Sequence, residues 1–446
     1  MTDQKHDKTG GVLEVDRTYN LHSWARQKGL KPVHVTKAEG IYFWDASGKR
    51  YYDMSSQLVN MNVGHGNKKI ADAIKRQVDT LAFLAPPFAV DVRAEAARKI
   101  VEVAPEGMAK VFFTNAGAEA NENAIKIARM VTGRNKIFSR YRSYHGASYG
   151  AANLTGEPRR FPSEPGIPGF VKFFDPYLYR APVAFGKEAE ATSYYIGQLR
   201  EQLEYESPGN VAAIFLETVT GSNGVIIPPE GYLQGVRELC DEFGVLLVCD
   251  EVMSGWGRTG QWFAVDNWGV KPDIITFAKG VTCGYVPLGG VIVNEQIARH
   301  FDDNPLMCGL TYSGHPVGCA AAVATIDVYK DEGLIEKARE RGVFFKKELE
   351  KLMGAHPSVG EVRAIGLFGA VELVKDKTTR EPLVPYGKDP EGIMPGILGM
   401  LKERGFWNYS HENILIVAPP LIITEDEIIE ALAILDEVLS IVDEGV

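Results

Sequence analysis

Short apolar runs alternate with helix-like segments through the middle of this 446-residue chain. The runs, rich in Val, Ile, Leu, Ala and Phe, are residues 110–114, 211–216, 245–249 and 274–277. Apolar runs of this length, bounded by polar or glycine-containing segments, are typical of strands buried on both faces of a sheet. The segments between them have helical spacing, as at 120–130 and 231–243. This alternation predicts an α/β fold around a mostly parallel central sheet.

The two ends of the chain have a different pattern. Aromatic-rich runs flank the turn-like Asp45-Ala-Ser-Gly48, which predicts a hairpin. Towards the C-terminus we expect a charged helix at 333–352, strands at 359–374 and a final amphipathic helix at 425–442, with Thr424 as its N-cap. We therefore expect a large domain over 65–330 and a smaller α+β domain built from 1–64 and 331–446.

Composition limits the classes of partner. The chain has 48 basic and 58 acidic residues and a net charge of −10, which does not favour a nucleic-acid-binding surface. The opening residues 1–7 are polar and lack the apolar core of a secretory signal. Near-apolar stretches such as 317–326 are shorter than the roughly 20 residues that cross a bilayer. We expect a soluble, cytoplasmic protein that contacts neither membranes nor nucleic acid.

The cysteines predict no disulfide framework and no metal site. The five of them are odd in number and form no CxxC pair. Cys240 and Cys249 lie in apolar surroundings, so we expect them to be buried, inert thiols.

A run of small residues follows the strand expected to end at Thr114. The segment Asn115-Ala-Gly-Ala-Glu-Ala-Asn121 contains Gly117 and Ala118, and a helix is expected from about Glu119. Backbone N–H groups at a helix start that side chains do not crowd can bind a phosphate. An ordinary tight turn would have the same composition, and this segment alone does not exclude it.

Two charged residues follow later strands. Asp250 lies at the carboxyl end of one, where α/β sheets bind ligands and where a buried carboxylate needs a cation or a protonated ring nitrogen. Lys279 follows the next, where a desolvated amine becomes nucleophilic. Taken singly, Asp250 could be a solvated carboxylate and Lys279 a surface lysine. With the small-residue segment they supply the contacts that pyridoxal 5′-phosphate needs: an anion site, a carboxylate for the pyridine nitrogen and an amine for the aldehyde.

With these motifs the chain resembles the class III aminotransferases of fold type I, over about residues 35–440. The resemblance also rests on the motifs Tyr144-His-Gly146, Glu217-Thr-Val219, Asp250-Glu-Val252, Lys279-Gly280 and Thr311-Tyr-Ser-Gly-His-Pro316. It implies a pyridoxal-phosphate fold with a mostly parallel sheet in the large domain. It also implies that Lys279 is the lysine that bonds the cofactor and moves the proton, and that Asp250 pairs with the pyridinium.

The resemblance implies further cofactor contacts. Gly117 and Ala118 would bind the phosphate through backbone N–H groups, Tyr144 would stack on the ring with His145 beside it, Val252 would pack on the other face, and Glu217 would lie near the cofactor hydroxyl. The residue matching Thr311 reaches the phosphate of a neighbouring subunit, which implies a homodimer with shared active sites and leaves a tetramer open. Outside this context, Tyr144 and His145 would be interpreted as core residues.

Within the family, residues 55–60 and 407–409 are most similar to taurine–pyruvate and ω-amine–pyruvate aminotransferases. The substrate pocket implied by this similarity contains Leu58, Val59, Trp407 and Tyr409. Two departures matter: many ω-amine members have tryptophan at the position of Val59, and several have a carboxylate-binding arginine at that of Tyr409. The carboxylate contact is therefore unassigned, with Arg404 and Arg258 as candidates. Ala118 also replaces a hydroxyl residue that is common in the phosphate loop.

The resulting hypothesis is a ping-pong transfer of an amino group from an ω-amino acid or primary amine, such as taurine or β-alanine, to pyruvate or another 2-oxo acid. An aminomutase or decarboxylase on the same fold would share the cofactor contacts but would need no second oxo acid. A non-catalytic, cofactor-binding regulator would need a DNA-binding module, and the first 30 residues are too short and too weakly basic for one.

One motif points to another enzyme class. Gly146-Ala-Ser-Tyr-Gly150 matches the G-x-S-x-G elbow of α/β hydrolases, with Ser148 as the nucleophile. The elbow requires a buried strand that runs directly into the serine, whereas residues 140–145 are polar and cationic. We therefore keep the hydrolase as a remote alternative.

Overall fold

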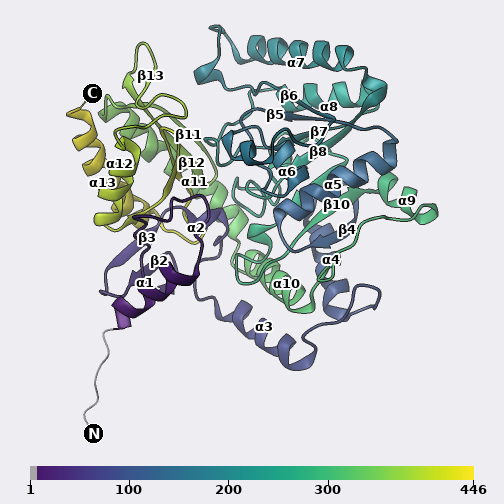
Figure 1. Ribbon diagram of the computed structural model, residues 1–446, viewed down its shortest axis with the longest axis horizontal. Coiled ribbons are helices and arrows are strands. Elements are labelled where there is room, and N and C mark those ends of the chain that lie inside the picture. The colour runs from purple at the N-terminus through teal and green to yellow at the C-terminus, as the bar shows by residue number, and fades with distance from the viewer. Residues whose placement is uncertain (1–7, 446) are drawn as a thin grey trace.

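The computed structural model describes residues 8–445. At its centre lies a seven-stranded sheet with the order β4-β10-β9-β8-β7-β5-β6 (Figure 1). Its strands are β4 (Met108–Thr114), β5 (Lys136–Arg140), β6 (Phe170–Phe173), β7 (Val211–Glu217), β8 (Leu246–Asp250), β9 (Ile274–Phe277) and β10 (Gly289–Asn294). Strands β5 to β9 run parallel, and β10 is antiparallel to β9 and β4. The predicted α/β fold with a mostly parallel sheet is confirmed.

Alternate residues of the central strands face different helices. On β7, Ile214 and Leu216 share a buried cluster with residues of α7 (Glu188–Tyr205) and α8 (Tyr232–Phe243). Their neighbours Ala213 and Phe215 share a second cluster with residues of α5 (Gly117–Thr132). Since side chains alternate across a strand, an unbroken apolar run fills both helix–sheet interfaces.

Two smaller sheets are built from the chain ends, with the strand orders β1-β2-β3-β14 and β11-β12-β16-β15, and β13 beside β12. The strands are β1 (Val35–Glu39), β2 (Tyr42–Asp45), β3 (Arg50–Asp53), β11 (Val359–Ile365), β12 (Phe368–Asp376), β13 (Glu381–Pro382), β14 (Phe406–Trp407), β15 (Tyr409–His411) and β16 (Ile414–Val417). The predicted hairpin is confirmed, because β2 and β3 pair antiparallel. In the turn, Asp45 Oδ1 accepts the backbone N–H groups of Ser47 and Lys49.

The remaining helices cover these sheets and connect them. They are α1 (Lys8–Tyr19), α2 (Ser56–Val59), α3 (Lys68–Thr80), α4 (Asp91–Val103), α6 (Tyr149–Leu154), α9 (Glu295–Asp303), α10 (Pro316–Asp331), α11 (Leu334–Ala355), α12 (Ile393–Glu403) and α13 (Glu425–Asp443). The start of α13 is the one expected: Thr424 caps it, and Glu427 closes a capping box. None of the helices in residues 8–445 combines the length and the apolar character needed to cross a bilayer.

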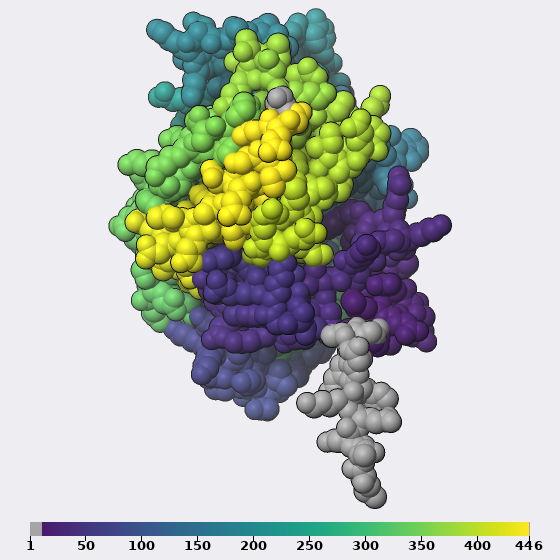
Figure 2. Space-filling view, turned by 90° about the vertical axis from the view of Figure 1, so that its left-hand side faces the viewer, coloured from purple at the N-terminus to yellow at the C-terminus, as the bar shows by residue number. Residues whose placement is uncertain are grey.

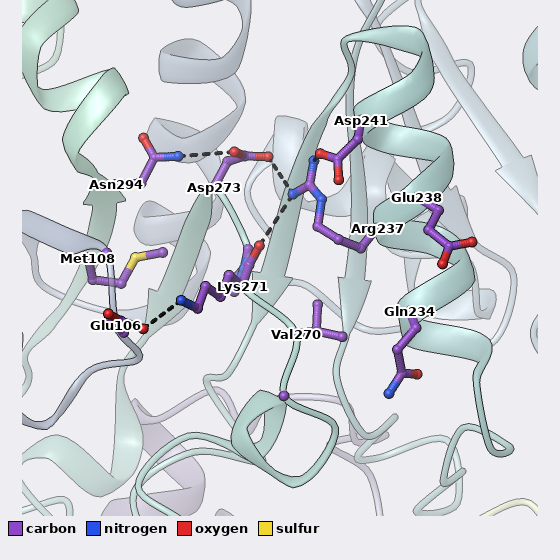
Figure 3. Close-up of a pocket in the computed structure, with 13 residues that line it drawn as sticks. Glu106, Met108, Gln234, Arg237, Glu238, Asp241, Val270, Lys271, Asp273 and Asn294 are labelled. Carbon is purple, nitrogen blue, oxygen red and sulfur yellow. Dashed lines mark hydrogen bonds and ion pairs between the residues drawn. The ribbon is translucent and has the colours of Figure 1, made fainter.

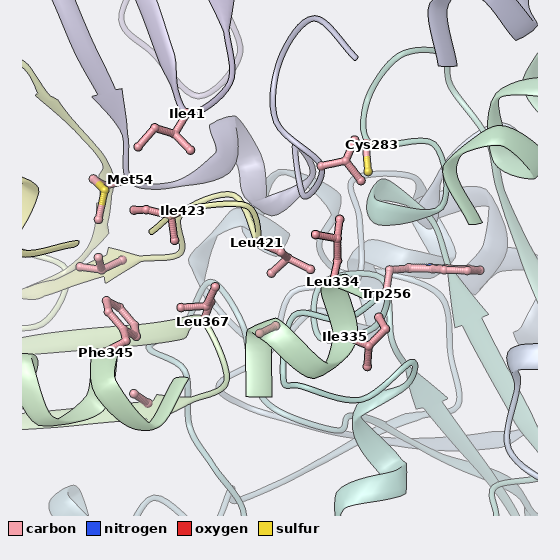
Figure 4. Close-up of a cluster of buried hydrophobic side chains, with 14 of the residues drawn as sticks. Ile41, Met54, Trp256, Cys283, Leu334, Ile335, Phe345, Leu367, Leu421 and Ile423 are labelled. Atoms are coloured by element: carbon pink, nitrogen blue, oxygen red, sulfur yellow. The ribbon is translucent and has the colours of Figure 1, made fainter. Parts of the chain in front are cut away.

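One buried cluster joins both ends of the chain to the centre. Figure 4 shows it from Ile41 of the N-terminal part through Ile423 of the C-terminal part and Phe345 of α11 to Trp256 of the central part. On the face shown in Figure 2, the purple N-terminal and yellow C-terminal surfaces meet. The boundaries expected near residues 64 and 330 stay a prediction. The polar segment 1–7 lies outside the described residues.

Candidate active site

The carboxyl ends of the central strands bring together the charged residues predicted from the sequence. Glu217 and Asp250 end β7 and β8 and are register partners across that pair. Asp250 is in turn the register partner of Thr276 in β9, and Lys279 follows shortly after the end of β9. Because these strands are parallel, the three charged side chains meet at one edge of the sheet, where α/β folds bind ligands.

Asp250 is buried among hydrogen-bond donors. Its Oδ2 accepts from Asn121 Nδ2 at 2.8 Å and from His145 Nδ1 at 2.7 Å, and its Oδ1 accepts from the Val252 backbone N–H at 2.9 Å. The Thr276 hydroxyl orients Asn121 by donating to its Oδ1 at 2.8 Å. Since Oδ1 receives a single donor from the described residues, it has a lone pair for a cationic group, which a carboxylate removed from water requires.

His145 carries an orphaned polar atom. Its Nε2 is buried and has no hydrogen-bond partner among the described residues. Each such atom in a folded protein needs an explanation, and a group bound beside Asp250 would give this one a partner. The resemblance to the class III aminotransferases implies that His145 lies beside the cofactor, and this stays a prediction.

Lys279 lies deep in the protein while part of its surface stays accessible to solvent, as expected for a side chain that lines a cavity. Burial lowers the pKa of Lys279 to about 8, although the negative charges of Asp250 and Glu217 oppose this shift. Its backbone has a φ of 48°, in the left-handed region that lysine seldom adopts. Strain of this kind persists where the surrounding fold holds a functional side chain in place.

Glu217 connects the strand edge to the loop that carries Tyr144. Its Oε1 accepts the Tyr144 backbone N–H at 3.0 Å, and its Oε2 accepts that of Gly221 at 2.7 Å. Burial raises the pKa of Glu217, and the charge of Asp250 raises it further. The carboxyl group therefore orients the Tyr144 loop.

The helix start at Gly117 is uncapped. Ala116, the N-cap residue of α5, makes no side-chain cap hydrogen bond, so the first N–H groups of the helix have no capping acceptor. A Cβ at Gly117 would lie 2.9 Å from Val252 Cγ1, and one at Gly146 would lie 2.6 Å from the Ala118 Cβ. The close packing demands glycine at both positions, and the N–H groups of Gly117 and Ala118 form a cradle suited to an anion.

The structure adds an arginine and a tryptophan that the sequence analysis missed. The Arg159 guanidinium carbon lies 3.8 Å from the Tyr144 ring centroid and 5.5 Å from that of Trp24. The two aromatic rings meet edge to face at 6.3 Å. Arg159 Nη2 donates to Ser222 Oγ at 3.0 Å, and its Nε donates to Glu157. The charge of Arg159 also contributes to the lowered pKa of Lys279.

Neither of the two arginines named as candidates for the carboxylate contact is suited to that role. Arg258 is fully buried, and its Nη1 and Nη2 donate to Leu367 O, Pro419 O, Ser56 Oγ and Asn62 Oδ1. Arg404 is exposed at the end of α12, with Nη1 3.3 Å from Met400 O and Nε 3.6 Å from Glu437. Both candidates are set aside, because Arg258 hydrogen-bonds within the core and Arg404 faces outward. A sequence pattern does not reveal which donors the core already uses.

The four residues of the expected substrate pocket lie in different surroundings. Val59 is 2% exposed and packs with the Val219 cluster, whereas Leu58 is 57% exposed. Trp407 packs edge-on against Phe43 of the N-terminal sheet at 5.7 Å. Tyr409 has a buried hydroxyl without a partner among the described residues, and burial raises its pKa. Since Arg159 opposes that rise and Glu217 adds to it, Tyr409 belongs to the same charged environment as Lys279.

The hydrolase alternative does not fit the local structure. Strand β5 ends at Arg140, and an irregular segment separates it from Ser148, the exposed N-cap position of α6. A nucleophile elbow requires a strand that leads directly into the serine.

A pocket of about 530 Å³ lies at the other edge of the sheet (Figure 3). The residues that line it lie near the start of β4 and β9 and near the end of the antiparallel strand β10. They are therefore away from the carboxyl ends of β7 and β8. Its main charges are paired with one another: Arg237 contacts Asp273 at 2.8 Å and Lys271 contacts Glu106 at 2.6 Å. The predicted site residues are not among those that line it.

Two of the cysteines could be judged from the sequence. Cys240 and Cys249 are buried, as predicted, and burial raises the pKa of both thiols.

Comparisons with known proteins agree with this arrangement. The family described as "Aminotransferase class-III" matches residues 23–439. A taurine–pyruvate aminotransferase of Bilophila wadsworthia is 33% identical over 97% of this chain and 98% of its own length. A putrescine–pyruvate aminotransferase of Pseudomonas aeruginosa is 35% identical over 90% of this chain and 89% of its own.

A solved structure shows the same architecture. The taurine:2-oxoglutarate aminotransferase of Bifidobacterium kashiwanohense, in complex with pyridoxal phosphate and glutamate, is 49% identical and superposes with a TM-score of 0.95, over 98% of either chain. The match with the family covers most of the sequence, and the fold that brings Glu217, Asp250 and Lys279 together is also the fold of the solved structure. This chain therefore belongs to the class III aminotransferase family and is a transaminase of fold type I.

Proposed function

We propose that this transaminase uses pyridoxal 5′-phosphate to move the amino group of taurine, or of a similar ω-amino acid, to a 2-oxo acid. The observation that carries the proposal is the position of the Arg159 guanidinium, which lies over the Tyr144 ring and beside Trp24. Its charge also lowers the pKa of Lys279. The named relatives that act on taurine support this choice of donor.

The residues present fit the cofactor. The N–H groups of Gly117 and Ala118 would hold its phosphate, Asp250 its ring nitrogen and Lys279 its aldehyde, and Tyr144 and Val252 would lie against its ring. The orphaned Nε2 of His145 and the glycine required at position 117 are consistent with a group that completes this space. When bound, pyridoxal phosphate supplies an aldehyde that condenses with amines and a cationic ring that accepts electrons.

The chain itself performs the proton transfer. With a pKa of about 8, Lys279 Nζ is partly neutral near neutral pH, so it can accept a proton from the substrate carbon and return it to another carbon. The Asp250 carboxyl group would pair with the ring nitrogen, and Asn121 and His145 orient it. One pocket then serves the amine and the oxo acid in turn, as a ping-pong scheme requires.

Arg159 supplies the anion recognition. Its planar fork matches a sulfonate or carboxylate in a two-point contact, and the aromatic rings of Tyr144 and Trp24 stabilise the cation itself. Glu157 and Ser222 hold Nε and Nη2 of the guanidinium, so little rotamer freedom is lost on binding, and Nη1 has no partner among the described residues. Taurine, β-alanine and related ω-amino acids all carry an amine at a short distance from an anion.

We also propose that two copies of the chain form a homodimer in which Thr311 reaches the phosphate of the neighbouring site. Phe83, Phe88, Met307 and Tyr312 are 40%, 58%, 73% and 56% exposed, and we name this patch the 83–88/307–312 surface. Phe83 and Tyr312 contact each other at 5.7 Å, so the patch is continuous around Thr311. Large apolar patches mark interaction sites.

The cytoplasmic location expected from the sequence stays a prediction.

A donor–acceptor panel tests the proposed function. The purified holoenzyme is incubated with taurine, β-alanine, putrescine and 4-aminobutyrate, each with pyruvate, with 2-oxoglutarate or with no oxo acid. We expect turnover with taurine or β-alanine that depends on the oxo acid, which separates transamination from an aminomutase or decarboxylase. Lys279→Ala should lose both turnover and the absorbance of the lysine-bound cofactor. Full turnover in that variant, or turnover without any oxo acid, contradicts the proposal.

A further inference from the structure

We propose that Tyr329 is a positioning residue for the reaction: its hydroxyl holds the backbone turn that carries Lys279 and thereby sets where the amine lies for proton transfer. The inference rests on the proposed function, in which Lys279 bonds the cofactor and moves the proton. It adds a buried residue of α10, which acts through the Lys279 backbone rather than on the substrate.

The segment that carries Lys279 contains two strained residues. Lys279 begins a 3₁₀ turn that ends at Val281, and its φ is 48°. Cys283, two residues beyond the turn, has a φ of 49°. Residues with side chains seldom adopt this left-handed region, and they keep it only where the surrounding structure holds them there. The turn therefore needs contacts from other parts of the chain.

Tyr329 supplies such a contact. Its hydroxyl donates to the carbonyl oxygen of Gly280, the residue after Lys279, at 2.9 Å. The Cys283 thiol is a second donor to the same oxygen, at 3.4 Å, and its Sγ lies 3.3 Å from the Tyr329 hydroxyl oxygen. A thiol is a weak donor, so the tyrosine hydroxyl makes the stronger of the two bonds. A carbonyl group in the middle of the turn is thus held by a side chain of α10.

Gly280 is also packed too tightly to shift freely. A Cβ at this position would lie 2.6 Å from Trp256 Cβ and 2.7 Å from Asn62 Nδ2. Asn62 is itself fixed, because its Nδ2 donates to Trp256 O at 2.9 Å and its Oδ1 accepts from Arg258 Nη2 at 2.7 Å. Packing therefore limits the movement of the turn, and the hydrogen bond from Tyr329 gives it a direction.

The surroundings of Tyr329 keep its hydroxyl in place and protonated. The side chain is fully buried, and its ring meets Trp262 edge to face at 5.6 Å. It belongs to the buried cluster of Figure 4, together with Cys283 and Trp256. Burial raises the pKa of Tyr329 well above its usual range, so the hydroxyl keeps its proton and remains a donor. In Tyr329→Phe the ring would keep its packing and only the hydrogen bond would be lost.

Cofactor binding by the apoprotein tests the inference without any substrate. The apoprotein is titrated with pyridoxal phosphate, and the absorbance of the lysine-bound cofactor is followed. In Tyr329→Phe we expect the Kd to rise about tenfold, the size expected for the loss of one buried hydrogen bond. The matched control is Tyr51→Phe, because the buried Tyr51 hydroxyl donates to Asp45 Oδ2 at 2.9 Å in the N-terminal sheet. It should keep the Kd within about twofold of the wild-type value.

Isotope kinetics on the holoenzyme identify the step that is affected. Single turnovers are measured with taurine and with taurine deuterated at the carbon that bears the amine. In Tyr329→Phe the rate constant should fall about 10- to 100-fold, because misplacement of a reacting group by about 1 Å costs up to about 100-fold. The slowed step should show a primary isotope effect, since the carbon–hydrogen bond breaks in it. A smaller folded fraction would lower only the amplitude of the absorbance change and leave the rate constant as it is.

A second variant covers the case in which Tyr329→Phe does not fold. Cys283→Ala removes the weaker donor to the Gly280 oxygen and should slow the same step about two- to fivefold. An unchanged Kd and rate constant in Tyr329→Phe, equal changes in Tyr51→Phe, or a slowed step without an isotope effect would overturn the inference. A wild type that binds the cofactor through Lys279 but does not react with taurine would contradict the proposed donor, and the titration would still decide the role of Tyr329.

Discussion

At the scale of single residues, the charge of Asp250 is the property on which the proposed chemistry depends. In Asp250→Asn the amide keeps the size of the side chain but removes the anion that a protonated ring nitrogen needs. We expect kcat/KM for transamination to fall about 10²- to 10³-fold, the magnitude seen when one electrostatic contact to developing charge is removed. Steady-state kinetics with taurine and a 2-oxo acid measure the effect.

The matched control is Asp241→Asn, because Asp241 lies on α8 beside the pocket at the other edge of the sheet and is 67% exposed. It should retain wild-type kinetics. If Asp250→Asn keeps more than about a tenth of the activity, the carboxylate does not have the proposed role.

The amine of Lys279 should titrate well below ordinary lysines. Burial lowers its pKa to about 8, and only the neutral amine is nucleophilic, so its reactivity should rise with pH and level off above about 8. Exposed lysines should keep gaining reactivity towards a pH of about 10.4. Reductive methylation of the apoprotein at a series of pH values, read by peptide mass spectrometry, compares Lys279 with exposed Lys351. Identical pH profiles at the two positions would contradict the shift.

Some of the site was visible in the sequence and some was not. Asp250 and Lys279 could be predicted because each follows an apolar run, and a parallel sheet brings such positions to one edge. Arg159 lies in a 3₁₀ turn over Pro158–Ser163, and Trp24 in an irregular N-terminal segment. Neither segment has a periodicity that fixes its position relative to the sheet. The sequence therefore does not show that Arg159 and Trp24 contact the Tyr144 ring.

At the scale of elements, His356 links the end of α11 to α13. Its Nδ1 lies 2.7 Å from Asp443 Oδ2, and its Nε2 lies 3.0 Å from Asp436 Oδ1. Burial alone would lower the pKa of His356, but the hydrogen bonds to the two carboxylates outweigh it and raise the pKa above 6.5. The sequence predicted both helices and the Thr424 cap. It did not predict this contact between the C-terminal ends of α11 and α13, because the contact depends on how the two helices pack.

The raised pKa of His356 makes the stability contributed by this contact between α11 and α13 depend on pH. The folded state binds the His356 proton more tightly than the unfolded state, so this stabilisation is complete below pH 6.5 and is lost as the pH rises through the folded pKa. His356→Gln should lower the free energy of unfolding by about 1 kcal/mol at pH 6 and by less at pH 9. Urea unfolding of both proteins at the two pH values measures the difference. An equal loss at pH 6 and pH 9 would show that His356 acts by packing alone.

At the scale of the whole molecule, the fold makes the site from segments that are far apart in the sequence. The strand edge supplies Glu217, Asp250 and Lys279, the loop after β5 supplies Tyr144, and the N-terminal segment supplies Trp24. The alternating apolar runs were enough to predict the sheet. They could not show the reversal at β10, because an antiparallel strand buried on both faces has the same apolar pattern as its parallel neighbours.

The two segments of the exposed 83–88/307–312 surface are held together by hydrogen bonds from Arg93. Arg93 Nε donates to Gly314 O at 2.8 Å, while its Nη1 and Nη2 donate to Phe88 O and Leu84 O at 2.7 and 2.9 Å. One side chain thus fixes both segments of the surface. An apolar patch that is held rigid in this way loses little entropy when it is covered by a second copy of the chain.

We therefore expect sedimentation analysis to give a mass near 98 kDa, twice the 49.0 kDa of one chain. The double variant Phe88→Glu/Met307→Glu should sediment as a monomer, because each substitution forfeits about 1.5–3 kcal/mol of apolar burial and adds a charge at the interface. It should also lose transaminase activity, since Thr311 would no longer reach the neighbouring site. Tyr205→Glu, at an 83% exposed position on α7 outside this surface, should remain dimeric and active. A fully active monomer of 49.0 kDa would show that each site is complete within one chain.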